Sequence, residues 1–328
     1  KTTMTYLENS KQYTGSDLEN IFFRPMLTGE SAQDLGVRVL YNMPQPTHVQ
    51  LWDGQRNILQ KFTSAGWAGG KAATKYEKTV NLNRVKAELG FSAANYFSMV
   101  YEKVSSLVNT HMDDLSGTEL EQAETALFKQ ALAENIRVTM WIGDTSAASG
   151  YNTFDGLLKR INGLVDDDGV YNFSYQAAAL EDPAYVVELF DKLWAGADPR
   201  IPGLKADDRL AYFVSSDIYR LYEKYLDAKG ADAAYADAMN GRRTLAYHGI
   251  PVVDVRLGSY LGATSFRQSF VMLTDRRNLV LAVNTADMPG NEVRMWYNPD
   301  EMENRQRAVF MAGTQILDEA LISFAYKQ

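Results

Sequence analysis

One stretch of the chain, residues 57–91, constrains its fold more than any other. Two strand-like arms flank a tip of small residues, which carries a single large side chain, Trp67. On the second arm polar residues alternate with apolar ones, namely Val80 and Leu82 and, after a slip of one residue, Val85, Ala87, Leu89 and Phe91. This period of two predicts a ribbon with one apolar face, and a lone two-stranded ribbon is only marginally stable in water. The ribbon must therefore pack on its own domain or on a neighbouring copy, and we favour the neighbour.

Composition sets the scale of the core and the class of partner. The chain has 328 residues, 46% of them hydrophobic, so it can bury a substantial core as two domains or as one large α+β unit. Its 41 acidic and 33 basic residues give a net charge of −8, which argues against nucleic-acid binding through a broad basic face. No apolar run approaches the roughly 18 residues of a membrane-spanning helix, and no signal peptide is visible, so we expect no membrane partner.

The sequence contains no cysteine, which excludes disulfides, thiolate nucleophiles and zinc–cysteine sites. This fits synthesis in a reducing cytoplasm. The sequence begins at Lys1 rather than at methionine, which a maturation cleavage and an arbitrary starting point would explain equally well.

Two motif-like stretches lack the residues that their chemistry requires. The ribbon tip resembles a phosphate-binding loop, but Ala65 stands where a Walker A motif needs glycine and Ala72 where it needs serine or threonine. The sequence DDDG at 166–169 resembles part of a calcium loop, but Leu164 and Tyr175 then occupy the first and last ligand positions. We therefore expect a hairpin tip and an acidic turn at these places, with no metal ion and no cofactor.

The histidines and carboxylates select no catalytic site. The chain has three histidines, His48, His111 and His248, and none lies in an HExxH or GxSxG context. His248 precedes a Gly-Ile-Pro sequence, and we interpret it as a strand-end residue rather than a general base. No pair among the carboxylates is singled out for acid/base work.

Helical and strand patterns are mixed along the chain. The longest helix is predicted over residues 118–142, spanning roughly 37 Å, with Leu127 and Ala131 on one marked line along it. Shorter helices are predicted after Ser16-Asp17, after Asp182-Pro183 and after Ser216. Strands are predicted over 249–255, 269–274, 279–283, 293–297 and 306–325, with a turn at 275–278 and a helical portion within 316–324. This order predicts an α+β fold and not a repeating βαβ pattern.

The order of parts resembles the major capsid protein of tailed bacteriophages, whose Hong Kong 97 (HK97)-like fold is shared with encapsulin compartments. The matching stretches are the arm sequence FFRPMLTGESAQDLGVRVL, the long helix TELEQAETALFKQALAENIRVTMWIGD, the segments YFVSSDIYRLYEKYL and YHGIPVV, and the returning segments FVMLTDRRNLVLAV and QRAVFMAGTQILDEALISFAY. The resemblance covers essentially the whole chain, but it lies in architecture rather than in an invariant signature.

The resemblance implies a division of the chain into four parts. These are an N-terminal arm with a first strand (1–56), an extended loop or E-loop (57–91), a peripheral (P) domain with a spine helix at about 118–142 (92–170 and 291–328), and an axial (A) domain (171–290).

The resemblance also implies a function. It implies a protein that is not an enzyme, and that self-assembles into hexamers and pentamers of an icosahedral phage head enclosing double-stranded DNA without sequence-specific binding. The expected partners are further copies of the chain, a portal, and scaffold, decoration or auxiliary capsid proteins. The expected location is the virion, with assembly in the bacterial host cytoplasm. The arm and the loop would then overlap neighbouring subunits, and this overlap would bury the ribbon.

Four residues are expected at contacts between subunits, namely Trp67 and Lys71 on the extended loop and Phe22 and Phe23 on the arm. Some relatives cross-link a loop lysine to an asparagine of a neighbour. Lys71, Lys75 and Lys78 lie in the corresponding region, but no acceptor asparagine and no assisting acid can be matched. A cross-link is therefore a hypothesis only.

Two alternatives stay open at this stage. One remains within self-assembly and is an encapsulin-like shell around a cargo enzyme, or a decoration protein. The other belongs to a different class and is a soluble acidic α+β enzyme that uses paired carboxylates. A deep pocket with raised carboxylate pKa values would favour the enzyme.

Overall fold

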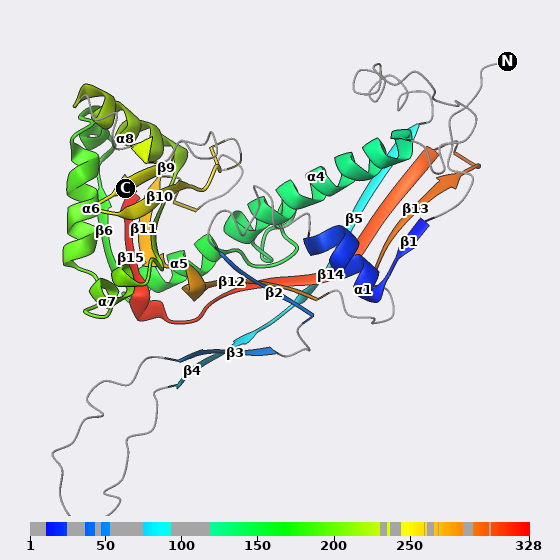
Figure 1. Cartoon of the computed structure of the whole chain (residues 1–328), viewed down its shortest axis with the longest axis horizontal. Helices are drawn as coiled ribbons and strands as arrows, with labels where there is room; N and C mark the ends of the chain where they lie inside the picture. Colours follow the sequence, from blue (N-terminus) through cyan, green and yellow to red (C-terminus); the bar gives the residue numbers. More distant parts are fainter. Residues whose placement is uncertain are drawn as a thin grey trace, which may run out of the picture.

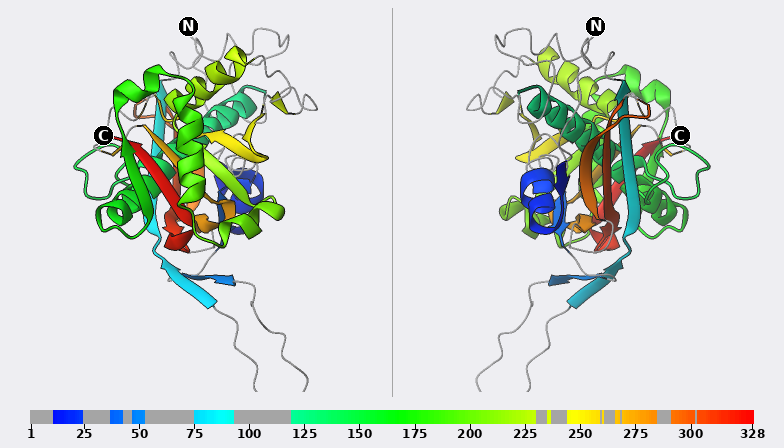
Figure 2. Two further views of the ribbon diagram at one scale, coloured as in Figure 1. Left: turned by 90° about the vertical axis from the view of Figure 1, so that its left-hand side faces the viewer. Right: turned by 90° about the vertical axis from the view of Figure 1, so that its right-hand side faces the viewer.

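Two β-sheets and one long helix organise the chain. The computed structural model describes residues 11–24, 37–42, 47–52, 75–92, 119–229, 235–236, 244–258, 260, 266–267, 269–284, 291–301 and 303–328. A six-stranded and a seven-stranded sheet lie toward opposite ends of an elongated body, and the helix α4 runs between them (Figure 1). A separate two-stranded ribbon, β3–β4, projects from the body in the side views as well (Figure 2).

The six-stranded sheet is built around one long strand, β14 (Glu303–Ile316). Its order is β1 (Lys11–Tyr13), β13 (Glu292–Asn298), β14, β12 (Leu279–Asn284) and β2 (Arg38–Tyr41), with β5 (Asn83–Ser92) also paired to β14. β13 and β12 follow one another along one edge of β14, and β5 occupies the other edge. Alternate residues of β14 are buried, as expected for a sheet with one covered face.

Strand β5 confirms the predicted alternation but corrects its partner. Val85 is buried, whereas Lys86 and Glu88 are exposed. β5 pairs antiparallel with β14 of the same chain, from Ser92 opposite Glu303 to Asn83 opposite Ala312. The second arm of the predicted ribbon therefore packs on its own domain from residue 83 onward, because its apolar face completes the core of the sheet. Residues 83–91 of the stretch expected to be an extended loop thus lie in the six-stranded sheet.

Helix α4 (Glu119–Ile142) confirms the predicted long helix. It lies along the buried face of the six-stranded sheet, where Phe128, Leu132 and Ile136 are at most 4% exposed. The buried line is thus shifted by one residue from the predicted line through Leu127 and Ala131, both of which are only partly buried. The reason is that α4 turns Phe128 toward the sheet, because burying a phenylalanine ring removes more apolar surface from water than burying Ala131 would.

The seven-stranded sheet has a core on each face. Its order is β6 (Tyr171–Tyr175), β15 (Ile322–Lys327), β11 (Phe270–Asp275), β7 (Leu210–Val214), β10 (Ile250–Asp254), β9 (Thr244–Tyr247) and β8 (Tyr235–Ala236). One face contributes Phe213, Phe270 and Phe324 to the same core as Trp141 at the end of α4. The opposite face packs against α6 (Tyr185–Ala195) and α8 (Ser216–Ala228). Both faces are covered, so the central strands β7 and β11 are buried along their whole length and are mostly apolar.

Shorter elements complete the body. α5 (Leu157–Asp166) packs on α4 and on β14, and α7 (Ile201–Ala206) packs on β7 and β11. The predicted helices near residues 183–196 and 216–228 are confirmed, and α6 ends at Gly196 as its punctuation indicated. His248 and Gly249, with φ of 47° and 80°, form the two-residue turn between β9 and β10, where positive φ at both positions favours glycine. None of the described helices combines the length and apolar character that a membrane crossing requires.

Apart from the passage through α4 and α5, the chain crosses between the two sheets at two short connections. β11 and β12 flank a short 3₁₀ turn (Arg276–Asn278), but they lie in different sheets and do not pair with each other. β14 and β15 likewise lie in different sheets, joined through residues 317–321. Of residues 291–328, β13 and β14 therefore lie in the sheet that α4 covers, whereas the last strand, β15, completes the seven-stranded sheet.

Candidate assembly surfaces

A short helix docks the N-terminal arm on the chain's own core. α1 (Gly15–Asp17) continues into a π-helical turn, η1 (Leu18–Phe23). The Phe22 ring lies 6.0 Å from that of Phe128 on α4, and the Phe23 ring meets that of Phe310 on β14 edge-on at 5.0 Å between centroids. The arm therefore fills the space between the helix and the sheet with aromatic side chains.

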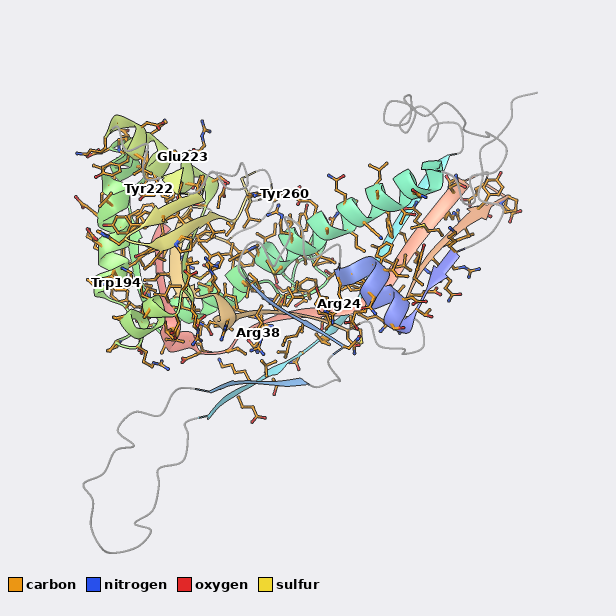
Figure 3. The ribbon with its side chains drawn as sticks, viewed as in Figure 1. Arg24, Arg38, Trp194, Tyr222, Glu223 and Tyr260 are labelled. Carbon is orange, nitrogen blue, oxygen red and sulfur yellow. The ribbon has the colours of Figure 1, made fainter. Side chains whose placement is uncertain are left out.

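Polar contacts fix the same arm helix. Glu19 is 8% exposed, and it accepts hydrogen bonds from Arg24 Nε at 2.8 Å and from Asn42 Nδ2. The guanidinium of Arg24, labelled in Figure 3, lies 4.8 Å from the centroid of the Tyr41 ring. Because Tyr41 ends the strand β2 and Asn42 follows it directly, these contacts tie the arm helix to the edge of the six-stranded sheet.

Two of the four predicted contact residues, Phe22 and Phe23, lie in the part of the chain that the structure describes. Phe22 and Phe23 have no exposed surface in the single chain, so the surface that they could offer to a neighbour is already used within the chain. Ile21, by contrast, is 48% exposed on the same helix. Trp67 and Lys71 lie outside the described residues, and their contacts with another subunit stay a prediction.

The projecting ribbon is anchored at its base by a small core of its own. β3 (Thr47–Trp52) and β4 (Lys75–Val80) pair antiparallel, from Thr47 opposite Val80 to Trp52 opposite Lys75. The core at the base consists of Val49, Val80, Leu82, Val280, Ala282 and Leu317, all at most 6% exposed. This cluster lies on β12 and on the second crossing between the sheets, so the ribbon is attached where the two sheets join.

Two further contacts hold the ribbon base close to β14. A Cβ atom at Gly313 would overlap the carbonyl oxygen of Asn81, so only glycine permits this approach. Gln315 Nε2 donates to the carbonyl oxygen of Thr79 at 2.9 Å. Lys78 forms an ion pair with Glu319, which gives this candidate cross-linking lysine a partner within its own chain.

Helix α4 is also tied to the loop that follows β10. The side chain of Arg137 is 5% exposed, and Nη1 donates to the carbonyl oxygen of Val255 at 2.7 Å. Arg137 also pairs with Glu134, which accepts a hydrogen bond from the hydroxyl of Tyr260 at 3.0 Å. The hydrogen bond from Arg137 is the main reason that the pKa of Glu134 is lowered.

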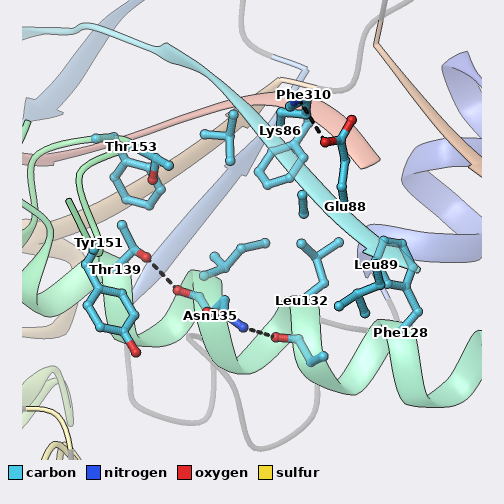
Figure 4. A pocket seen from close by; sticks show the side chains of 16 residues that line it. Lys86, Glu88, Leu89, Phe128, Leu132, Asn135, Thr139, Tyr151, Thr153 and Phe310 are labelled. Carbon is cyan, nitrogen blue, oxygen red and sulfur yellow. Dashed lines mark hydrogen bonds and ion pairs between the residues drawn. The ribbon is translucent and has the colours of Figure 1, made fainter. Parts of the chain in front are cut away.

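An apolar groove of about 490 Å³ separates β5 from α4 (Figure 4). Val85, Ala87 and Leu89 form the wall on β5, and Phe128, Leu132 and Ile136 lie on the α4 side. The polar side chains of the helix wall are occupied locally, since Asn135 Nδ2 donates to the carbonyl oxygen of Ala131 at 2.8 Å and Thr139 Oγ1 to that of Asn135 at 2.7 Å. The groove thus offers apolar surface and the edge of a strand rather than reactive groups.

Among the described residues, the carboxylates with a shifted pKa lie in structural ion pairs and hydrogen bonds. The pKa of Asp144 is lowered to about 2 by hydrogen bonds from Lys159, at 2.8 Å, and from Ser146. Lys159 also pairs with Asp155 at 2.6 Å, and the pKa of Asp155 is lowered as well. Among all the residues that the structure describes, no three His, Asp or Glu side chains lie close enough together to hold a metal ion. The pKa values of Glu134, Asp144 and Asp155 are all lowered, so their surroundings stabilise the ionised carboxylate.

Comparison by sequence gives no relative: no family model matches the chain, and no curated protein matches it.

Comparison by structure identifies the class of fold. The chain superposes on a chain of the satellite phage P4 procapsid including size determination (Sid) protein, with a TM-score of 0.56, 10% sequence identity, and coverage of 92% of this chain and 96% of that chain. A capsid chain of a native GTA particle (TM-score 0.47, 13% identity, 92% and 91% coverage) and the SrpI encapsulin from Synechococcus elongatus PCC 7942 (0.45, 9%, 88% and 84%) match more weakly, and their TM-scores are too low to support an inference. The chain has an α+β fold of the HK97-like capsid type, as the sequence predicted.

Sequence reasoning missed the groove and the two crossings between sheets. The groove combines residues 85–89 with residues 128–139, which are about forty positions apart, and nothing in either stretch announces the other. The exposed charges at Lys86 and Glu88 were visible as the polar half of the alternation, and they are the one local signal that marks this surface.

Proposed function

We propose that this chain is the major capsid protein of a tailed bacteriophage, and that it self-assembles into hexamers and pentamers of an icosahedral shell that encloses double-stranded DNA. The observation that carries the proposal is the fold match to a procapsid chain, which spans 92% of this chain and 96% of that one. Because the two chains share only 10% sequence identity, the match establishes the fold alone. The projecting ribbon and the charge of the chain supply the additional support for the function.

The anchored ribbon supports self-assembly. The β3–β4 ribbon has a core of six residues at its base, where β12 and residue 317 supply half of the packing. A two-stranded ribbon is only marginally stable unless a third element covers it. A neighbouring subunit that covers the ribbon beyond its base would supply that cover, and we place Trp67 and Lys71 in this contact. The six-stranded sheet with α4 then corresponds to the P domain, and the seven-stranded sheet with α6 and α8 to the A domain.

Such a shell fits the charge of the chain. With a net charge of −8, the subunit is expected to enclose DNA without gripping it, because strong phosphate contacts need clustered basic residues. A portal and scaffold, decoration or auxiliary proteins would complete the particle. Assembly would take place in the bacterial host cytoplasm, and the product would be part of the virion.

Electron microscopy of the expressed full chain tests the proposal. We expect closed shells with five-fold and six-fold capsomers, and a chain that stays monomeric in light scattering across the micromolar range would contradict it. Particles purified from infected cells and treated with nuclease separate the two kinds of shell. Protected genomic DNA supports a phage head, whereas a protein cargo identifies an encapsulin-like compartment.

A further inference from the structure

Strand β5 has one edge that no described strand occupies. Among the described strands it pairs with β14 alone, through ten consecutive residue pairs. An unpaired strand edge presents backbone N–H and C=O groups to which another extended chain can bind. β5 spans ten residues and contains no proline, so every residue along it can take part in a ladder. The edge is therefore long enough to specify one register.

The groove beside this edge suits the apolar face of an added strand. Val85 is 8% exposed, and Ala87 and Leu89 are only partly covered by the core. All three face α4 across the groove of about 490 Å³ (Figure 4). A strand paired to the free edge of β5 would point alternate side chains toward the same face. An occupant with apolar residues at every second position would therefore fill the groove.

The sequence of β5 is complementary to itself in one register. In an antiparallel pair of two β5 strands centred on Ala87, Lys86 of each copy lies opposite Glu88 of the other. In the same register Val85 lies opposite Leu89 of the second copy, on the face that lines the groove. A register centred on Lys86 or on Glu88 would instead place like charges directly opposite each other, which is unfavourable. Charge pattern and apolar pattern thus select the same centre.

We propose that the free edge of β5 is a two-fold interface at which the β5 strands of two copies pair antiparallel about Ala87, which extends the six-stranded sheet from one subunit into the next. The occupant of the groove is then the second copy's Val85, Ala87 and Leu89. A two-fold contact must be complementary to itself, which is the property that this strand has. The proposal rests on the proposed function as a self-assembling shell, and it adds one contact with a defined register.

Charge reversal tests the register. Lys86 and Glu88 are 61% and 54% exposed and form an ion pair with each other at 2.9 Å within the chain. An exposed pair of this kind contributes little to stability, so K86E and E88K should leave the unfolding curve of the subunit nearly unchanged. Each single variant should weaken association about tenfold, because two attractive pairs per interface become two repulsive ones. The double variant K86E/E88K restores the pairs and should restore assembly. The two single variants change the net charge in opposite directions, so an effect of net charge alone would not weaken both.

A cysteine at the centre tests the geometry directly. The chain has no cysteine, so A87C carries the only thiol and should form a disulfide-linked dimer in assembled shells under mild oxidation, reversed by dithiothreitol. R84C is the matched control on the same strand. Its two copies would lie about 20 Å apart at roughly 3.3 Å per residue, and it should give no dimer.

The outcomes separate this proposal from the proposed function. If the unmodified chain forms no shell, the proposed function fails and the interface fails with it. If the unmodified chain forms shells but A87C gives no cross-linked dimer in them, or if K86E/E88K assembles no better than the single variants, the β5 interface is wrong while the capsid function stands.

Discussion

Asn278 and Asp318 join the two crossings between the sheets by a reciprocal pair of hydrogen bonds. Asn278 Nδ2 donates to the carbonyl oxygen of Asp318, and the backbone N–H of Asp318 donates to Asn278 Oδ1, both at 2.7 Å. Asn278 is fully buried, and the Asp318 carboxylate accepts a further bond from Arg200 at 2.7 Å. One side-chain amide therefore satisfies the backbone of the other crossing at the point where the two halves of the molecule meet.

We predict that Asn278→Ala destabilises the chain by about 2 to 3 kcal/mol. The substitution leaves the N–H of Asp318 without its partner, and it removes the shorter of the two hydrogen bonds to the Asp318 carbonyl oxygen, which keeps only the bond of 3.4 Å from the N–H of Leu321. Urea unfolding of the unassembled subunit measures the change. Asn152→Ala removes one exposed contact of 3.3 Å to the carbonyl oxygen of Ala147 and serves as the control, with an expected effect within about 0.5 kcal/mol. Equal unfolding midpoints for the two variants would show that the amide bridge contributes nothing.

The crossing at Asn278 shows how far sequence reasoning could reach. Asp275 to Asn278 looks like a hairpin turn between two apolar strands, and both strands exist as predicted. They lie in two sheets because their partners are distant strands, β7 and β15 for β11 and β14 for β12, so no local pattern could reveal the separation. Helices α4, α6 and α8 were predictable because their apolar period lies within the helix itself and punctuating residues mark the ends.

Some features of the candidate assembly surfaces could also be predicted from the sequence, whereas others could not. The alternation of β5 was visible in the sequence, since exposed Lys86 and Glu88 follow the period of two. That its apolar face packs on its own sheet was not visible, because the complementary strand begins at Glu303. Phe22 and Phe23 were predicted at a subunit contact because they lie in an arm-like segment, yet their rings pack on Phe128 and Phe310. Long-range packing partners are the information that a single sequence does not carry.

We predict that Phe23→Ala destabilises the isolated subunit by about 3 to 5 kcal/mol, because it opens a cavity beside Phe310. If Phe23 acted only between subunits, the unassembled chain would unfold as before and assembly alone would suffer. Ile21→Ala is the matched control on the same helix. Ile21 is 48% exposed, so its truncation should leave the unfolding free energy of the subunit within about 0.5 kcal/mol of the unmodified chain.

We predict that Gly313→Ala costs about 1 to 3 kcal/mol, because the added Cβ forces β14 away from Asn81 at the ribbon base. Thermal or urea unfolding checks the stability, and electron microscopy checks whether shells still form. Gly163→Ala is the control within α5, since no atom beyond the adjoining residues and the backbone of its own helix lies within 4 Å of the added Cβ. Alanine also favours the helix, so this control should stabilise by about 0.5 to 1 kcal/mol. A loss of stability at both positions would point to a general intolerance of alanine rather than to the close approach.

We predict that the ion pairs around Lys159 make stability depend on pH in the acid range. The pKa of Asp144 is lowered from 3.8 to about 2 in the folded chain, so the folded state favours the ionised carboxylate. This contribution is fully present above the unfolded pKa of about 4 and is lost as the pH falls toward 2. Asp144→Asn removes the titrating group, so between pH 5 and pH 2 its unfolding temperature should fall less steeply than that of the unmodified chain. Glu223→Gln makes the same change in net charge on α8, away from the ion pairs around Lys159, and it should follow the unmodified curve. Parallel curves for all three proteins would mean that Asp144 contributes no measurable linkage.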